Sequence, residues 1–275
     1  MATKIWFITG ISRGFGMVLS EALLAKGETV IGTTRDGKPP FADKTGRLHV
    51  LALDVTDPAA IKGCARPGDR HPRADRRRRQ QWRLRPARRD RGGDRGTGRA
   101  SVRREFPRHP ARHSGRAAAA APATVRPYRH ITSIAGLAPM AGSGFYAASK
   151  FAVEGLSQAL AYEVAPLGIK VTLVEPGAFR TDFLSEHSLR KTEAGSDDYA
   201  ATAGAAVARL DAMAGQQIGD PVRAAAAIIE AVAAAEPPLH LVLGSDAFRR
   251  VQEKQKSFAA DLERWQTVSL GTDFA

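Results

Sequence analysis

The sequence contains very little cysteine: Cys64 is the only one in 275 residues. A single cysteine excludes an internal disulfide and is typical of proteins in a reducing compartment. The sequence also has no apolar run long enough to span a membrane, and its first residues, Met1-Ala2-Thr3-Lys4, lack a secretory-signal pattern. We therefore expect a cytoplasmic protein with no membrane segment.

Lysine is absent from one strongly basic segment. Between Arg66 and Arg116 there are 19 arginines, five acidic residues and no lysine, which gives this segment a net charge of +14. Because the whole chain carries +13, the remaining residues carry a net charge of −1. A basic protein often binds nucleic acid, but here the body of the protein is nearly neutral. By composition, the segment is predicted to be disordered.

The rest of the chain alternates short apolar runs with helical patterns. Strands are predicted at residues 4–9, 29–33, 49–53, 128–133, 169–175 and 239–243. Helices are predicted near 18–25, 143–165 and 221–235 and along the C-terminus around Trp265, and the small-residue-rich stretch 180–215 is expected to form a mobile lid. This alternation predicts a single domain over residues 1–275: an α/β, doubly wound, mostly parallel Rossmann sheet.

A glycine-rich turn follows the first predicted strand and opens the first helix: Thr9-Gly10-Ile11-Ser12-Arg13-Gly14-Phe15-Gly16. Its glycines permit a tight turn, close approach of the backbone to a pyrophosphate, and close helix–strand packing. The helix N-terminus then offers free N–H groups to the phosphates. The position of the turn favours a dinucleotide site over a tight turn without a ligand.

Arg35 lies just past the second predicted strand. An acidic residue there would bind a ribose 2′-hydroxyl, whereas arginine suits a 2′-phosphate. Arg13 in the glycine-rich turn could reach the same phosphate. We therefore favour NADP(H) over NAD(H), against the alternative of two solvated surface arginines.

Tyr146 and Lys150 lie four residues apart on the predicted helix 143–165, and hence on one face. A tyrosine is a poor base at neutral pH because its pKa is about 10, but a neighbouring ammonium favours the phenolate. Ser133, at the end of the preceding strand, could hydrogen-bond the same substrate oxygen. The spacing alone is common on exposed helices; the glycine-rich turn, the strand-end serine and a later Pro176-Gly177 favour an acid/base centre.

Taken together, these motifs resemble the short-chain dehydrogenase/reductase family over about residues 3–63 and 128–275, and the C-terminal residues resemble a branch similar to 17β-hydroxysteroid dehydrogenases. The resemblance implies that Tyr146 exchanges the proton, Ser133 orients the substrate oxygen, and Lys150 binds the nicotinamide ribose. It also implies further cofactor contacts from Asp54, Val55, Pro176, Gly177, Phe179 and Thr181. Homodimers or tetramers through the helix 143–165 are expected on the same basis.

The segment 64–127 departs from the family, which has a fourth strand, an Asn-Asn-Ala-Gly turn and a helix with a catalytic asparagine there. Read one base later with CGN arginine codons, the residues Asp75–Trp82 can become Ile-Asp-Val-Val-Val-Asn-Asn-Gly. The same shift permits Asn-Phe at Glu105-Phe106. We therefore predict a frameshift that begins near Lys62 and is restored near Arg126.

The sequence thus predicts an NAD(P)-dependent oxidoreductase that interconverts a small-molecule carbonyl and an alcohol, with no metal site. Two alternatives are a cofactor-binding relic without turnover and a nucleic-acid-binding protein that uses residues 66–116 as a disordered arm. The segment has little aromatic interleaving and no repeated basic motif, which makes the arm less favoured. Leu137, Met140, Phe145, Phe179, Phe183 and Leu184 could line an apolar substrate pocket or pack in the core.

Overall fold

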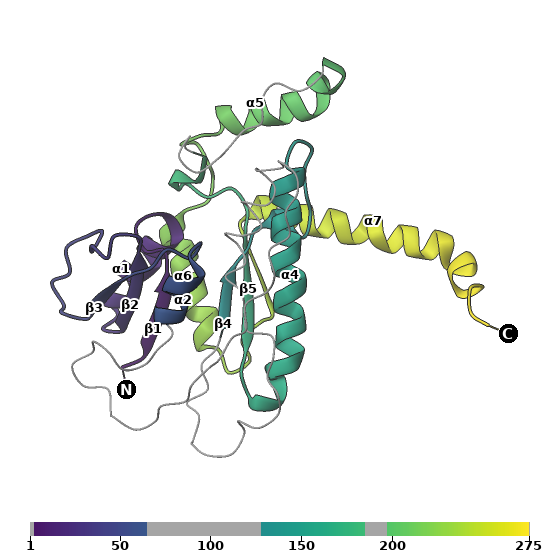
Figure 1. The fold of residues 1–275 in the computed structure, drawn as a ribbon. Helices are drawn as coiled ribbons and strands as arrows, with labels where there is room; N and C mark the ends of the chain where they lie inside the picture. The colour runs from purple at the N-terminus through teal and green to yellow at the C-terminus, as the bar shows by residue number, and fades with distance from the viewer. Residues whose placement is uncertain (1–2, 65–127, 185–196, 275) are drawn as a thin grey trace.

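A computed structural model describes residues 3–64, 128–184 and 197–274, and strands alternate with helices along them (Figure 1). The strands are β1 (Ile5–Thr9), β2 (Thr29–Thr34), β3 (Leu48–Ala52), β4 (Tyr128–Ile131), β5 (Val171–Pro176) and β6 (His240–Leu243). The α-helices are α1 (Gly14–Ala25), α2 (Pro58–Cys64), α4 (Gly144–Val164), α5 (Ala205–Ala212), α6 (Pro221–Ala233) and α7 (Ser245–Leu270). All six predicted strands and the four predicted helices are confirmed, with small shifts at their ends.

The six strands form two three-stranded parallel sheets. One has the order β1-β2-β3 and the other β4-β5-β6. Within the described residues, β1 pairs only with β2 and β4 only with β5. Strand β1 of the first sheet and strand β4 of the second lie close to each other. The Arg129 guanidinium of β4 is 5.0 Å from the centroid of the Trp6 ring of β1. The predicted fourth-strand region, with Gln80-Gln81-Trp82 and Glu105-Phe106, lies outside the described residues.

One hydrophobic core spans both sheets on the face covered by α1 and α6. Leu19 and Leu23 of α1 and Ile228 of α6 pack there with Val30 of β2 and Val174 of β5. These side chains recur on α1 at the helical period, which is why this face of the helix is buried. The shared core makes the two sheets parts of one layered α/β structure.

Helix α4 covers the opposite face of the second sheet. Successive strand residues point to opposite faces, so Glu175 lies on the other side of β5 from Val174. Glu175 is fully buried on that side, near Glu154 of α4. Helices on both faces confirm the doubly wound arrangement.

On the same side of the first sheet, β1 is exposed to solvent. Ile5 and Phe7 of β1 are 70% and 56% exposed, although both are large apolar side chains. Exposed apolar surface of this kind is unfavourable for a central parallel strand, which is normally covered on both faces. Among the described residues, no element covers these two side chains of β1.

The stretch from 180 to 215 contains more helical structure than we expected. It holds the 3₁₀ turns η3 (Asp182–Leu184) and η4 (Asp197–Tyr199), a π-helical turn η5 (Ala200–Gly204) and α5. Residues 185–196 lie outside the described part, so the lid stays a prediction. Across the described residues, no helix combines the length and the apolar character needed to cross a membrane.

Candidate active site

The glycine-rich turn from Thr9 to Gly16 connects β1 to α1. Gly10 and Gly14 have φ angles of 74° and 59°, a conformation that glycine adopts readily. The Gly10 N–H donates to the Thr33 Oγ1 of β2 at 3.1 Å, which fixes the turn against the neighbouring strand. A Cβ on Gly16 would lie 2.1 Å from the Gly10 carbonyl oxygen, so only glycine fits there.

The start of α1 offers free hydrogen-bond donors. Arg13 is the N-cap residue and makes no side-chain capping hydrogen bond, and the first turn contains no acidic residue. Ser12 and Arg13 are exposed, whereas Phe15 is half-buried. A helix N-terminus without a capping side chain or a nearby carboxylate is suited to a phosphate.

Arg35, Asp54 and Val55 follow the carboxyl ends of β2 and β3. Arg35 is exposed and Val55 is half-buried. The Asp54 carboxylate accepts hydrogen bonds from the backbone N–H and the Oγ1 of Thr56, at 2.8 and 2.6 Å, which hold its side chain in a tight turn. Because parallel strands end at the same edge of a sheet, these three residues lie along the edge that carries the glycine-rich turn.

Tyr146 and Lys150 lie on consecutive turns of α4. The Lys150 Nζ is 5.7 Å from the centroid of the Tyr146 ring, within the range of a cation–π contact. Lys150 is only 6% exposed, whereas Tyr146 is half-buried and reaches the surface. This geometry places a cation beneath a phenol that solvent or a ligand can reach.

Ser133 caps the 3₁₀ turn η1 (Ile134–Gly136) rather than ending β4, which stops at Ile131. Its Oγ accepts a hydrogen bond from the Ala135 N–H at 3.2 Å. This turn packs against α4, because a Cβ on Gly136 would lie 3.1 Å from the carbonyl oxygen of Lys150. The turn that carries Ser133 therefore rests on the turn of α4 that carries Lys150.

The loop after β5 is held by the end of β6 and the start of α7. The Gly177 N–H donates to the Leu243 carbonyl oxygen at 2.9 Å, and the Ala178 N–H donates to the Asp246 Oδ2 at 2.9 Å. A Cβ on Gly177 would lie 2.4 Å from the Asp246 carboxylate, so a larger residue would displace this contact. Pro176 is buried, and Thr181, further along the loop, is half-buried.

Two aromatic contacts bring these segments together. Phe15 of the glycine-rich turn meets Phe179 of the loop after β5 with ring centroids 5.3 Å apart. Tyr146 meets Phe183 of η3 with centroids 5.5 Å apart. The structure thus joins the glycine-rich turn to the loop after β5, and the end of that loop to the tyrosine. It leaves Arg35 exposed at the sheet edge.

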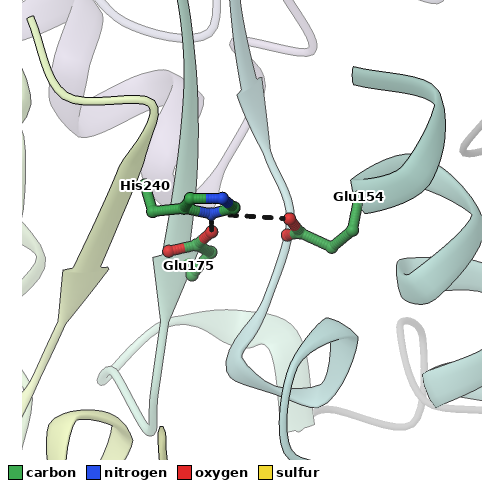
Figure 2. Close-up of side chains that lie close together, drawn as sticks. All are labelled: Glu154, Glu175 and His240. Atoms are coloured by element: carbon green, nitrogen blue, oxygen red, sulfur yellow. Dashed lines mark hydrogen bonds and ion pairs between the residues drawn. The ribbon is translucent and has the colours of Figure 1, made fainter. Parts of the chain in front are cut away.

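Two buried glutamates, Glu154 of α4 and Glu175 of β5, meet the exposed His240 of β6 (Figure 2). The His240 Nδ1 is 2.5 Å from the Glu175 Oε1 and 3.9 Å from the Glu154 Oε2. The Thr132 Oγ1 donates to the Glu154 Oε1 at 2.5 Å. The cluster therefore joins α4, β5 and β6 at one point, and Thr132, which immediately precedes Ser133, is bound to it.

Burial changes the acidity of both carboxyl groups. It raises the pKa of Glu175 to about 7, against an opposing hydrogen bond from His240. Burial also raises the pKa of Glu154, although the hydrogen bond from Thr132 opposes this change. Among the described residues, the Oε2 of each glutamate has no hydrogen-bond donor. Burial of a carboxyl group with one oxygen unpaired favours its protonated form.

The three side chains offer ligand atoms within 4.8 Å of one another, which raises the question of a metal. Two ligands on one tetrahedral zinc lie about 3.3 Å apart, because each metal–ligand bond is about 2 Å long. The 2.5 Å contact between His240 and Glu175 is shorter and has hydrogen-bond geometry. The cluster is therefore a network of two hydrogen bonds, Thr132 to Glu154 and His240 to Glu175, linked by the ion pair between His240 and Glu154.

The sequence analysis missed this network. One signal was available, because Glu175 follows Val-Thr-Leu-Val in a strand that is otherwise suited to full burial. A charged residue in such a strand requires a buried partner. Its partners, Glu154 and His240, come from a distant helix and strand, and no sequence spacing indicates that they meet.

Comparison with known proteins shows to which family the chain is similar. The family model described as short chain dehydrogenase matches residues 130–192. The oxidoreductase BOA17 of Botryotinia fuckeliana is 31% identical over 289 residues, which cover 98% of this chain and 99% of that protein. A solved short-chain dehydrogenase from Streptomyces avermitilis is 32% identical, with a TM-score of 0.72, and the match covers 99% of this chain and 100% of that one.

More distant solved structures share the fold. A short-chain dehydrogenase from Burkholderia cenocepacia, in complex with NADP, is 16% identical with a TM-score of 0.59, and the match covers 96% of this chain and 97% of that one. A Burkholderia phymatum short-chain dehydrogenase/reductase, in complex with NAD, is 15% identical with a TM-score of 0.64, over 94% of this chain and 95% of that one. With a relative of 31% identity along nearly its whole length, the chain belongs to the short-chain dehydrogenase/reductase family of oxidoreductases.

Proposed function

We propose that the protein interconverts an apolar ketone and a secondary alcohol with NADP(H), and that Tyr146 transfers the proton. The observation that carries this proposal is the pairing of an accessible phenol with a buried ammonium on consecutive turns of α4. A cation held at this distance stabilises the phenolate, which allows the hydroxyl to give up and regain a proton.

The residues present fit a dinucleotide. At Gly10 and Gly14 the backbone has positive φ and a Cβ would meet no atom within 4 Å, so the backbone of the turn is open to the approach of a ligand. The N-terminus of α1 would hold the pyrophosphate, and Thr181 and the loop after β5 would position the nicotinamide. When bound, the nicotinamide supplies or accepts the hydride.

The 2′-phosphate of NADP would bind Arg35, with Arg13 on the other side. Both side chains are exposed near the edge where β1 and β2 end. Relatives in complex with NADP and with NAD share this fold, so the preference depends on these two arginines. Arginine gives charge-assisted, bidentate hydrogen bonds to phosphate, which a ribose hydroxyl cannot match.

In the reduction, the Tyr146 hydroxyl donates its proton to the carbonyl oxygen. The Ser133 hydroxyl donates a second hydrogen bond to the same oxygen and holds it in place, because the capping contact with Ala135 uses Ser133 only as an acceptor. The Lys150 ammonium stabilises the phenolate that remains on Tyr146. The same residues take the proton back when the alcohol is oxidised.

The exposed apolar ring of Phe183 beside Tyr146 favours an apolar substrate. Phe183 contacts the tyrosine ring and is 42% exposed, and Met140 and Phe145 are also exposed. Large apolar side chains around a polar reactive group are typical of a small-molecule site. Phe179, by contrast, is buried against Phe15 and contributes to the packing of the loop.

The direct test is NADPH oxidation by the purified protein with a panel of aliphatic, aromatic and steroid ketones. We expect turnover with at least one apolar ketone, and slower turnover with NADH. Measurable NADPH binding without turnover on any substrate would contradict the proposal and favour a cofactor-binding relic.

A further inference from the structure

The first two turns of α7 contact two loops that border the candidate active site, and the remainder of the helix extends away from the sheets (Figure 1). Ala247, in the first turn, is fully buried and packs with Ile134 and Ala138. Beside it, Asp246 binds the loop after β5, and one turn later Arg250 binds the loop after η1. The base of α7 therefore holds both loops through charged side chains.

Asp246 is fitted between two glycines. Its Oδ2 accepts a hydrogen bond from the Ala178 N–H at 2.9 Å. A Cβ on Gly177 would lie 2.4 Å from both carboxylate oxygens, and a Cβ on Gly244 would lie 2.7 Å from the Oδ1. Among the described residues, this buried Oδ1 has no hydrogen-bond donor. A carboxylate in such a position loses hydration, which distinguishes Asp246 from the solvated acidic residues further along α7.

Arg250 reaches from the second turn of α7 to the loop after η1. Its guanidinium donates a hydrogen bond to the Ala138 carbonyl oxygen. The Ala138 N–H in turn donates to the Ile134 carbonyl oxygen at 2.8 Å, within the turn that Ser133 caps. Burial lowers the pKa of Arg250, and the negative charge of Asp246, one helical turn earlier, opposes this change. The charge of Asp246 therefore also stabilises the cation that binds Ala138.

Both loops lead to residues of the proposed mechanism. The loop after β5 continues to Thr181, which we propose to position the nicotinamide, and η1 begins next to Ser133, which we propose to hold the substrate oxygen. Reacting atoms must be held about 3–3.5 Å apart, and a displacement of about 1 Å can slow a reaction about 100-fold. A single helix that binds both loops fixes their separation.

We propose that Asp246 and Arg250 are positioning residues for this site. Asp246 holds the loop after β5 in the shape that receives the nicotinamide, and Arg250 holds the turn that carries Ser133 at a fixed separation from that loop. This inference rests on the proposed function, because it assigns the two residues a task in the same site. It predicts two separate effects: loss of Asp246 weakens binding of the nicotinamide half of NADPH, and loss of Arg250 slows the reaction.

The first test measures binding to the full-length protein by calorimetry and needs no turnover. Its two ligands are NADPH and adenosine 2′,5′-bisphosphate, which has the adenine and the 2′-phosphate but no nicotinamide. We expect Asp246→Ala to bind NADPH about 10-fold or more weakly, the effect of losing one charged hydrogen bond, and to bind the bisphosphate with unchanged affinity. Asp246→Asn keeps an acceptor for the Ala178 N–H and should restore most of the NADPH affinity. The matched control, Asp261→Ala on the exposed part of α7, should change neither affinity.

The pattern of the two affinities separates the possible failures. An equal loss of affinity for both ligands in Asp246→Ala would indicate a general effect on the fold and would overturn the role of Asp246. Wild-type affinity for NADPH in this variant would overturn it as well. Wild-type protein that binds neither ligand would instead contradict the proposed function, and this inference with it.

The second test measures the single-turnover rate of ketone reduction in Arg250→Met, which keeps the aliphatic part of the side chain without the guanidinium. We expect a rate about 10-fold or more lower, at unchanged affinity for NADPH. In a Ser133→Ala background the same substitution should have little further effect, because Arg250 acts through that serine. Arg249→Met, at the exposed neighbouring position, is the control.

Two results would overturn the role of Arg250: a wild-type rate in Arg250→Met, or an equal loss of rate with and without Ser133. A wild-type protein that binds NADPH but reduces no ketone would contradict the proposed function alone, since the binding test of Asp246 does not depend on turnover.

Discussion

At the scale of single residues, glycine decides whether the cofactor turn can form. Gly16 leaves no space for a side chain, because its Cβ would meet the Gly10 carbonyl oxygen at 2.1 Å. Gly155 on α4 is the opposite case: it is exposed, and a Cβ there meets no atom within 4 Å. The two glycines therefore differ in what they contribute, although both lie in helices.

We predict that Gly16→Ala destabilises the protein by about 2 kcal/mol or more, because the turn must move to relieve the clash. NADPH binding should weaken in parallel. The matched control Gly155→Ala should stabilise by about 0.5–1 kcal/mol, since alanine favours an open helical position. Urea unfolding of both variants measures these changes, and an unaffected Gly16→Ala protein would contradict the account of the turn.

Arg35 is the second residue whose role can be isolated. We predict that Arg35→Ala raises the KM for NADPH by about 10- to 100-fold, which corresponds to the loss of one charged hydrogen-bonded contact. The KM for NADH should change little, because NADH has no 2′-phosphate. Arg223→Ala on α6 is the control, since Arg223 is exposed and forms an ion pair with Asp220 at 3.7 Å. Equal changes for both cofactors would refute the 2′-phosphate contact.

At the scale of elements, the Glu154–Glu175–His240 network joins α4, β5 and β6. Folding raises the pKa of Glu175 from 4.5 to about 7. Between pH 4.5 and pH 7, the folded state therefore keeps a proton that the unfolded state has lost. The contribution of this group to stability is complete below pH 4.5 and is lost as the pH rises through 7.

We therefore predict that the free energy of unfolding falls between pH 5 and pH 7.5, and that Glu175→Gln removes part of this slope. Glutamine is neutral at every pH and fills nearly the same space. Chemical denaturation at several pH values measures the slope. Glu163→Gln, at an exposed position on α4, should preserve it, and an identical slope in Glu175→Gln would show that the network does not titrate as described.

The elements were predictable from sequence because each follows a local pattern. The helix expected at 143–165 runs from Gly144 to Val164, and the strand expected at 169–175 runs from Val171 to Pro176. The contact between Tyr146 and Lys150 was also predictable. The two residues lie four positions apart on one predicted helix, and the motifs at Thr9–Gly16 and Ser133 precede them in the chain. What could not be predicted is tertiary: the network on Glu175 combines residues more than 60 positions apart, and no local spacing encodes it.

At the scale of the whole molecule, the exposed face of β1 limits stability. Ile5 and Phe7 are exposed on a strand that is paired on one side only within the described residues. Exposed apolar side chains on a parallel strand are unfavourable, because such strands are normally covered on both faces. We propose that a shifted reading frame between residues 62 and 126 accounts for this exposure.

We predict that reading codons 62–126 one base later restores the frame. The protein encoded in this way should have a higher melting temperature and bind NADPH more tightly than the present chain. Sequencing these codons and comparing the two proteins by calorimetry provides the check. Arginine codons of the AGR type in this region, or equal stability of the two proteins, would rule out the frameshift.

The role of Tyr146 as proton donor is tested most directly by single-turnover reduction of a ketone by wild-type protein and by Tyr146→Phe. We predict that the variant loses at least about 100-fold in rate, the usual contribution of general acid catalysis, while its affinity for NADPH stays within a few-fold. A Tyr146→Phe protein that reduces the ketone at the wild-type rate would contradict the assignment of the proton donor.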